Sequence, residues 1–237
     1  MPLGSLALSL SAAAAVAAAP APASVSLRSA DGWTLEATYR PARPGRPTLI
    51  LAHGVGSARA EWSRLAERLA LKGVGTLAVD LRGHGGSLNG PWGRADFTSF
   101  DARSEWPRAE ADVRAAASWL ELRGVPRESI AFGGASIGAN LAAAVAADAS
   151  RAPFLLLLSP GTDYRGVRLK ARPGLDALAV ASMQDAYAFS AVDELRRRGL
   201  ATVLTAPAGH GVQVFDDPAT LEAVVSWVAR LRRRTPP

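Results

Sequence analysis

Short apolar runs alternate with stretches of helical periodicity along most of the chain. The apolar runs lie at residues 48–54, 75–85, 129–134, 153–161, 177–182 and 201–206. Helical spacing of apolar residues lies between or after them, at 57–72, 105–123, 136–147, 187–198 and 217–234. Continuous apolar strands suit a sheet that is buried on both faces, and strand–helix alternation is the signature of βαβ units. The sequence therefore predicts an α/β fold with a mostly parallel central sheet and helices on both faces.

Two further features complete the expected domain. Residues 25–41 alternate between apolar and polar side chains around Asp31-Gly32, which predicts two strands joined by a turn. Residues 87–104 and 162–174 contain several glycines and prolines, and we expect both segments to be loops that line the ligand crevice. With no internal repeat and no second composition regime, residues 24–237 are predicted to form a single domain with minimal or no cap.

Composition excludes several kinds of site. The chain has no cysteine, so disulfides, thiolate metal sites and cysteine nucleophiles are all ruled out. Its formal charge of +6 comes mostly from arginine, with clusters at 196–198 and 230–234. These arginines are not interleaved with aromatic residues, and we interpret them as solvated helix ends rather than a nucleic-acid site.

The first 23 residues differ from the rest of the chain. They carry no charged side chain, residues 6–19 are apolar and rich in alanine, and Ala21-Pro22-Ala23 offers small residues for cleavage. A signal peptide is the favoured interpretation, which predicts export to the periplasm or the medium. A disordered leader or a misplaced start, with a cytoplasmic protein, is the alternative. The apolar part is short for a stable membrane span.

One serine lies between two glycines at the junction of a predicted strand and a predicted helix. The residues Gly134-Ala135-Ser136-Ile137-Gly138 fit the pattern G-x-S-x-G in that context. A strand that turns directly into a helix exposes its corner residue, and small neighbours are needed where the chain returns. The helix also directs its free N–H groups at the same point. Taken alone, Ser136 could equally be an ordinary helix cap.

Residues that could activate this serine follow it in the chain. A serine hydroxyl needs a histidine to accept its proton and a carboxylate to orient that histidine. His210 follows the strand at 201–206, and Asp185 follows the strand at 177–182. The order Ser136, Asp185, His210 is the order found in α/β-hydrolases. Asp163 and Asp193 are the other candidates for the carboxylate, and Asp193 falls within a predicted helix.

Together these segments resemble the α/β-hydrolase superfamily, and in particular compact dienelactone-hydrolase-like proteins and small serine esterases. The resemblance spans about residues 47–227 and is carried by LAHG, DLRGHG, GGASIGAN, the aspartate and the final GHG. It implies that Ser136 is the nucleophile, that His210 is the general base and then the acid, and that Asp185 orients the histidine. It also implies an oxyanion hole formed by the backbone amides of Val55 and Ile137.

The resemblance assigns structural roles to the two remaining histidines. His53 is expected to brace the loop that carries Val55, and His84 to sit in a structural turn. Asp80 is expected to hydrogen-bond its own loop. The histidines are scattered and show no zinc-binding spacing, and neither nucleotide-binding glycine pattern is present. We therefore expect no metal and no cofactor.

The expected reaction is hydrolysis of a carboxylic ester through an acyl-enzyme. Dienelactone hydrolases generally use a cysteine that this chain lacks, so a lactone is a less favoured substrate. Thioesterase or peptidase activity would use the same triad, and a non-catalytic binding protein could share the fold. Trp92, Tyr164 and Met183 are the candidate contacts to a small-molecule substrate. The oligomeric state is left open.

Overall fold

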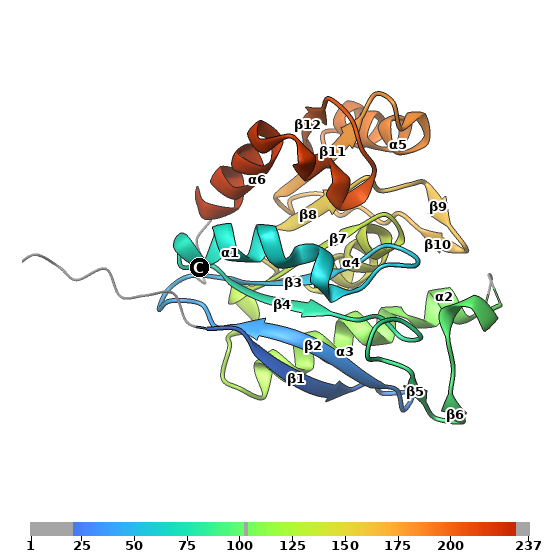
Figure 1. Cartoon of the computed structure of the whole chain (residues 1–237). Coiled ribbons are helices and arrows are strands. Elements are labelled where there is room, and N and C mark those ends of the chain that lie inside the picture. The colour runs from blue at the N-terminus through green and yellow to red at the C-terminus, as the bar shows by residue number, and fades with distance from the viewer. Residues whose placement is uncertain (1–20, 102–103, 231–237) are drawn as a thin grey trace, which may run out of the picture.

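The computed structural model describes residues 21–101 and 104–230, and within them ten strands form one twisted sheet (Figure 1). Six strands are mutually parallel: β3 (Thr48–Ala52), β4 (Gly75–Val79), β7 (Ile130–Ala135), β8 (Leu155–Leu158), β11 (Ala177–Ser182) and β12 (Thr202–Ala206). Four strands extend one side in antiparallel pairs: β1 (Ala23–Arg28), β2 (Thr34–Arg40), β5 (Asn89–Gly90) and β6 (Gly93–Arg94). The predicted α/β fold is confirmed.

The strand order places β7 near the middle of the sheet. The order is β12-β11-β8-β7-β3-β4-β2-β5-β6, with β1 paired to β2. Because the six parallel strands run the same way, their C-terminal ends meet at one end of the sheet, which we call the carboxyl end; their N-terminal ends form the amino end. Ser136, Asp185 and His210 follow β7, β11 and β12, so the topology brings all three to the carboxyl end.

Helices cover both faces of the sheet. On one face lie α1 (Ser63–Leu71) and α6 (Pro218–Arg230), whose apolar residues pack with Leu49, Leu51 and their neighbours. On the other lie α3 (Glu110–Glu121), α4 (Ile137–Asp148) and α5 (Ala186–Arg197), which pack with Ile50 and Ala52. Successive residues of β3 thus point into opposite cores, which is why its sequence is continuously apolar.

Two predicted helices differ from the structure. Residues 57–72 form a 3₁₀ turn (Arg59–Trp62) before α1, and residues 105–123 divide into α2 (Glu105–Arg108) and α3. Ala109 lies at the second break, where the amide of Ala109 bonds to Trp106 and that of Asp112 bonds to Ala109. These tighter i→i+3 bonds turn the chain so that both Trp106 and Asp112 are buried.

Both segments predicted as loops contain a small hairpin. Residues 87–104 include β5 and β6, and β5 joins the main sheet through Thr34 and Asn89. Residues 162–174 include β9 (Asp163–Tyr164) and β10 (Val167–Arg168), which pair only with each other. Two-residue strands carry too little periodicity to be recognised in a sequence. Residues with positive φ make the turns possible: Gly93 directly follows the first turn as the first residue of β6, and Arg165-Gly166 form the second turn.

Parts of the sequence predictions lie outside the described residues. The predicted leader, residues 1–23, falls there except for its last three residues, and β1 begins at Ala23. The last predicted helix is described as far as Arg230. Among the helices of the described residues, none combines the length and hydropathy needed to cross a membrane.

A buried ion pair fixes the loop that follows β4. Arg82 is fully buried and hydrogen-bonds the carboxylate of Asp112 at 2.7 to 3.1 Å, and it also reaches Asp31 at 2.7 Å and Glu105 at 3.1 Å. Burial lowers the pKa of Arg82, but the carboxylates of Asp112 and Asp31 raise it by more, so the guanidinium is charged. The cluster joins β4, α2, α3 and the β1–β2 turn. It therefore supports the loop that carries His84.

Candidate active site

Ser136 lies at the turn between β7 and α4 with a backbone conformation that is rare for a residue with a side chain. Its φ is 55° and its ψ is −125°, and its amide donates a 2.8 Å hydrogen bond to the carbonyl of Leu158 at the end of β8. Residues other than glycine seldom adopt a positive φ, and those that do are often found at functional sites. The turn leaves the Ser136 side chain partly exposed at the carboxyl end.

The two glycines that flank Ser136 are required by close backbone packing. A Cβ atom at Gly134 would lie 2.2 Å from the carbonyl oxygen of Gly138, and a Cβ at Gly138 would lie 2.2 Å from the carbonyl oxygen of Ala52. Contacts this short do not occur between real atoms, so each position admits only glycine unless the backbone moves. The pattern G-x-S-x-G here reflects steric need.

Asp185 and His210 form a direct pair at the same end of the sheet. His210 Nδ1 lies 2.6 Å from Asp185 Oδ2, while Asp185 Oδ1 accepts a 3.3 Å hydrogen bond from the amide of Ala188 at the start of α5. A carboxylate can only accept, so Nδ1 carries the hydrogen and Nε2 of the neutral ring is free to accept a proton. The pair is partly exposed, with 43% of the His210 side chain and 17% of the Asp185 side chain accessible.

The backbone on either side of His210 places this residue next to the serine turn. Gly209 and Gly211 have φ values of 95° and 59°. The amide of Gly211 donates a 2.9 Å hydrogen bond to the hydroxyl of Ser159, and a Cβ at Gly211 would lie 3.3 Å from the Cβ of Ala135. The residue after His210 is thus packed against Ala135, the residue before Ser136.

Tyr164 lies beside His210. The ring of Tyr164 meets the imidazole of His210 edge-on with 6.4 Å between ring centroids, and the Tyr164 hydroxyl donates a 3.3 Å hydrogen bond to the carbonyl of Ser159. Among the hydrogen bonds of residues 21–101 and 104–230, none joins Ser136 directly to His210. Catalytic hydrogen bonds are often loose without substrate and tighten when it binds. Tyr164 therefore packs against the histidine of the aspartate–histidine pair.

The loop after β3 lies against Ser136. A Cβ at Gly54 would be 3.4 Å from the Cβ of Ser136, so the adjacent Val55 follows directly beside the nucleophile position. Ile137 is the first residue of α4, and its amide belongs to the first helical turn, whose N–H groups have no partner within the helix. The positions of Val55 and Ile137 on either side of Ser136 suit a pair of oxyanion donors.

Both remaining histidines brace this loop. His53 is fully buried; its Nδ1 donates to the carbonyl of Gly54 at 2.7 Å and its Nε2 accepts from the amide of Leu81 at 3.0 Å. The Nε2 of His84 accepts a 3.2 Å hydrogen bond from the amide of Gly56. Burial and the nearby His84 lower the pKa of His53 to about 4. His53 is therefore neutral at pH 7, as its two hydrogen bonds require.

Asp80 also has a structural position. Its carboxylate accepts hydrogen bonds from the amides of Arg59 at 2.6 Å and Gly86 at 2.8 Å, and it forms an ion pair with the Arg59 side chain. The bond to Gly86 lies within its own loop, as expected, and the bonds to Arg59 also join this loop to the one after β3.

The two alternative carboxylates lie elsewhere. Asp163 accepts a 2.8 Å hydrogen bond from the amide of Gly166 within the β9–β10 turn. Asp193 lies on α5 and pairs with Arg196 at 2.6 Å. Asp185 is thus the carboxylate that the structure places on His210.

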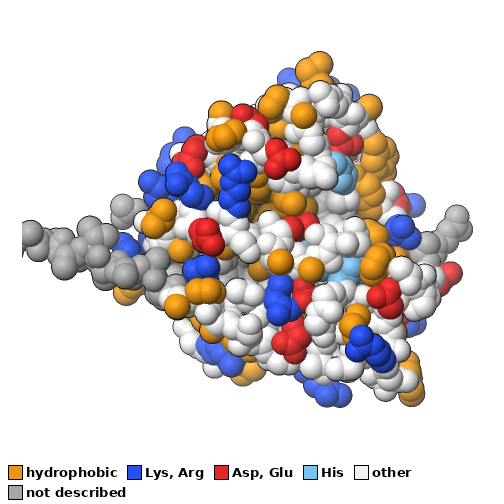
Figure 2. Space-filling view, in the orientation of Figure 1, with side chains coloured by type: hydrophobic (Ala, Val, Ile, Leu, Met, Phe, Trp, Pro, Cys, Tyr) orange, Lys and Arg blue, Asp and Glu red, His pale blue; other side chains and the backbone are white. Residues whose placement is uncertain are grey.

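The three candidate substrate contacts have different positions. Tyr164 touches the site directly, and Met183 is 71% exposed, two residues before Asp185. Figure 2 shows histidine side chains, in pale blue, at the surface with hydrophobic side chains, in orange, near them. Trp92 does not join them: it is 98% exposed at the β5–β6 turn and lines a separate hollow with Asp31 and Trp33. In the sheet, β5 is four strands from β7, so these two strands are about 19 Å apart.

Sequence reasoning missed three polar residues around the site. Ser159 has a φ of 48° and holds Gly211, and the buried Asn140 holds the β9–β10 hairpin. Glu61 is hydrogen-bonded to Ser57 beside the β3 loop, and burial raises its pKa despite that bond. Asn140 lies one helical turn after Ser136, and Ser159 directly follows β8, the strand next to β7, so their places in the sequence could have indicated a role near the site. No sequence pattern pointed to Glu61.

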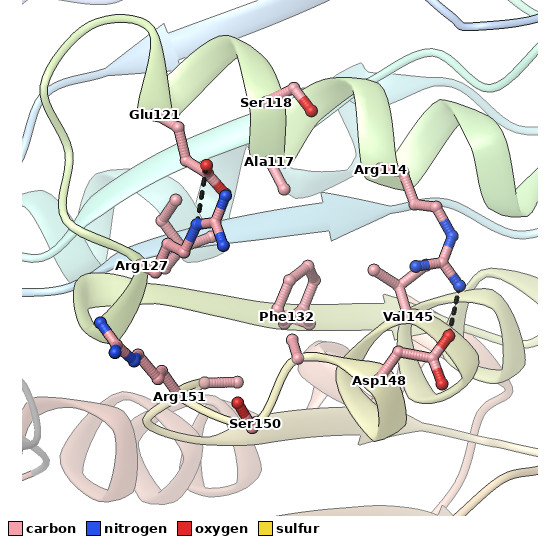
Figure 3. A pocket seen from close by; sticks show the side chains of 13 residues that line it. Arg114, Ala117, Ser118, Glu121, Arg127, Phe132, Val145, Asp148, Ser150 and Arg151 are labelled. Atoms are coloured by element: carbon pink, nitrogen blue, oxygen red, sulfur yellow. Dashed lines mark hydrogen bonds and ion pairs between the residues drawn. The ribbon is translucent and has the colours of Figure 1, made fainter.

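A separate hollow lies at the other end of the sheet. Its volume is about 730 Å³, and it lies between α3 and α4 at the amino ends of β7 and β8 (Figure 3). Ion pairs between Arg114 and Asp148 and between Arg127 and Glu121 border it. It contains none of the residues that follow the parallel strands at the carboxyl end.

The parallel sheet, the serine at the β7–α4 turn and the aspartate–histidine pair after β11 and β12 define an α/β hydrolase. Within that class, the chain belongs to the family described as serine aminopeptidase, S33, which matches residues 43–187. The matched range includes Ser136 and Asp185 and ends before His210. The predicted superfamily and enzyme class are confirmed.

Solved structures show the same fold. A dienelactone hydrolase from Anabaena variabilis has a TM-score of 0.63 at 18% identity and covers 90% of this chain and 97% of its own. An esterase from Pyrococcus furiosus has a TM-score of 0.67 at 17% identity, covering 89% of this chain and 91% of its own. At these identities the likeness concerns the fold alone.

Curated relatives match over a shorter region. The 2-succinyl-6-hydroxy-2,4-cyclohexadiene-1-carboxylate synthase of Salmonella paratyphi C is 40% identical over 60 residues, which is 25% of this chain. The chain spans 23% of the length of that relative.

Proposed function

We propose that the protein hydrolyses a carboxylic ester through an acyl-enzyme on Ser136. The observation that carries the proposal is the 2.6 Å contact between His210 and Asp185, with the next residue, Gly211, packed against the segment that leads into Ser136. Nε2 of His210 would accept the serine proton while Oγ attacks the carbonyl carbon. The same histidine would then protonate the leaving alcohol and activate water for the second step.

The charge that develops on the carbonyl oxygen needs fixed donors. The amides of Val55 and Ile137 lie on either side of Ser136 and are the proposed donors. Removing one such donor costs about 3 kcal/mol in enzymes where this has been tested. The loop that carries Val55 is braced by His53 and His84 through backbone hydrogen bonds, so its geometry is set before substrate binds.

The test compares turnover of p-nitrophenyl acetate by the wild type and by Ser136→Ala. We expect the substitution to lower kcat by about 10⁴-fold or more. Ser150→Ala, an exposed serine at the amino end, is the matched control and should be unaffected. Turnover that survives in Ser136→Ala would exclude the serine mechanism.

Peptide hydrolysis is the second candidate, because the family is described as serine aminopeptidase. The same triad could serve it. An aminoacyl p-nitroanilide assayed beside the ester would distinguish the two, since a higher kcat/KM for the anilide would favour the aminopeptidase.

We also propose export of the protein, on the composition of residues 1–23 alone. Mass spectrometry of the N-terminus of the protein from an expressing cell tests this. An intact Met1 would argue against cleavage of a signal peptide.

A further inference from the structure

The loop that carries Val55 contains a tight turn of four residues. The amide of Ser57 donates a 3.3 Å hydrogen bond to the carbonyl of Gly54, and Gly56 has a φ of 73°. A β-turn with a positive φ at its third residue favours glycine there. Two glycines in four residues leave the turn with much conformational freedom of its own. Its shape beside Ser136 therefore depends on the groups that hold it from outside.

The direction of the Val55 N–H is set by the Gly54 carbonyl. The two groups belong to one planar trans peptide unit, so they point in opposite directions. The carbonyl accepts a 2.7 Å hydrogen bond from Nδ1 of His53 and the 3.3 Å bond from Ser57. Among the hydrogen bonds of the described part of the chain, none uses the amide of Val55. This amide is therefore free to bind an oxyanion, and its direction depends on how the carbonyl is held.

Glu61 holds the far end of this turn. Its Oε2 accepts a hydrogen bond from the hydroxyl of Ser57. Glu61 lies in the 3₁₀ turn before α1, where its amide bonds to the carbonyl of Ala58 at 3.1 Å and the next residue, Trp62, is fully buried. The bond from Ser57 to Gly54 is longer than the usual length of about 2.9–3.0 Å. Such a bond holds the turn weakly by itself, so the contact with Glu61 supplies the restraint on Ser57.

The carboxylate of Glu61 is costly where it lies. The side chain is partly buried, and burial raises its pKa, although the bond from Ser57 acts in the opposite direction. Its second oxygen, Oε1, is buried and has no hydrogen-bond partner among the described residues. Burying a charge or an unpaired polar atom costs free energy. A group that lowers stability beside a reaction centre points to a role in function rather than in folding.

We propose that Glu61 is a positioning residue for the oxyanion of the proposed reaction. By holding Ser57, it keeps the Gly54 carbonyl turned away from the substrate and the Val55 N–H turned toward the carbonyl oxygen of the substrate. This inference rests on the proposed function. No bond or proton changes at Glu61 itself. Because the oxyanion forms in both acylation and deacylation, Glu61 acts on both steps.

The test measures kcat and KM for p-nitrophenyl acetate in Glu61→Ala. We expect kcat to fall about tenfold, less than the roughly 100- to 1,000-fold cost of deleting an oxyanion donor, because the amide of Ile137 stays in place. KM should change by less than about twofold, because both steps slow together. Glu61→Gln keeps an oxygen that can accept from Ser57, and we expect it to lose less than about threefold in kcat.

Removing the partner hydroxyl tests whether the bond itself matters. Ser57→Ala should lower kcat by the same factor as Glu61→Ala, and the double variant should lose no more than either single one. Ser63→Ala is the matched control, because the hydroxyl of Ser63 bonds at 2.8 Å to the carbonyl of Ala60 and not to the turn. It should leave kcat and KM unchanged.

A transition-state analogue separates positioning from loss of folded enzyme. Trifluoroacetone adds to a serine hydroxyl to give a tetrahedral oxyanion, so its inhibition constant reports on the oxyanion donors. We expect that constant to rise about tenfold in Glu61→Ala and in Ser57→Ala. Partial unfolding would instead lower kcat and leave the inhibition constant of the remaining enzyme unchanged. If a thermal unfolding midpoint shows that Glu61→Ala does not fold, Ser57→Ala carries the test.

Each outcome decides the proposal. An unchanged kcat in Ser57→Ala would overturn it, as would losses that multiply in the double variant or an inhibition constant that stays at the wild-type value. A loss in Glu61→Gln as large as that in Glu61→Ala would assign the effect to charge and would also overturn it. Failure of the proposed function is recognised separately, because Ser136→Ala would then keep its turnover, and this inference would fall with it.

Discussion

The two ends of the central sheet both carry charged side chains, but they are built differently. At the amino end, the 730 Å³ hollow is bordered by arginine–carboxylate pairs that neutralise each other. At the carboxyl end, Ser136 and Ser159 have positive φ, and His210 has one nitrogen engaged and the other free. The volume of a hollow is thus a weaker guide to chemistry than polar groups that are held in place without being neutralised.

The largest difference in turnover between the two ends should come from replacing one aspartate at each end. Asp185 and Asp148 each contact one basic side chain, at 2.6 Å and 2.5 Å. We expect Asp185→Asn to lower kcat by about 10⁴-fold, because an amide stabilises the wrong tautomer of His210. Asp148→Asn should leave kcat unchanged. Ester turnover measures both, and similar effects would remove the distinction between the two ends.

The next largest difference is expected in the free energy of unfolding when a glycine is replaced by alanine. Ala in place of Gly usually stabilises a helix, but Gly138→Ala would place a methyl 2.2 Å from the Ala52 carbonyl oxygen. We expect a loss of about 3 kcal/mol in unfolding free energy, together with reduced turnover. Gly124→Ala, at the end of α3, meets no atom within 4 Å and should cost about 1 kcal/mol, from its φ of 80°. Chemical denaturation compares them, and equal costs would contradict the steric argument.

The pH dependence of the unfolding free energy should report on His53, which is buried and braces the loop after β3 at the carboxyl end. Since burial and His84 lower the pKa of His53 to about 4, the unfolded chain binds more protons than the folded one between pH 6.5 and 4. This contribution is complete above pH 6.5, and about 3 kcal/mol is lost as the pH falls to 4. Denaturation at several pH values would show the slope, which should be shallower in His53→Gln. An unchanged slope would assign it to other groups.

The smallest effect is expected at the amino end. The Arg114–Asp148 pair is about half exposed on both sides, and such pairs contribute little. Arg114→Ala should change the unfolding free energy by no more than about 0.5 kcal/mol and leave ester turnover unaffected. A larger change in turnover would show that the two ends are coupled.

The sequence predicted the features that depend on local pattern. Apolar runs located the parallel strands, and strand ends placed Ser136, Asp185 and His210 at the carboxyl end. Features that depend on contacts between distant segments were not predicted. The break at Ala109 follows from the burial of Asp112 against Arg82, which no periodicity reveals. Trp92 was expected at the crevice because it lies in a loop, but the pairing of β5 with β2 carries it away from β7.

The way the β9–β10 hairpin is attached has a consequence for engineering. Its strands pair only with each other, and its anchors, Asn140 and Tyr187, belong to helices outside it. The residues at its tip can therefore be exchanged as a cassette, with the sheet untouched and the anchors retained. A library confined to position 165, in the turn directly after Tyr164, would then vary this part of the surface without unfolding the protein that displays it.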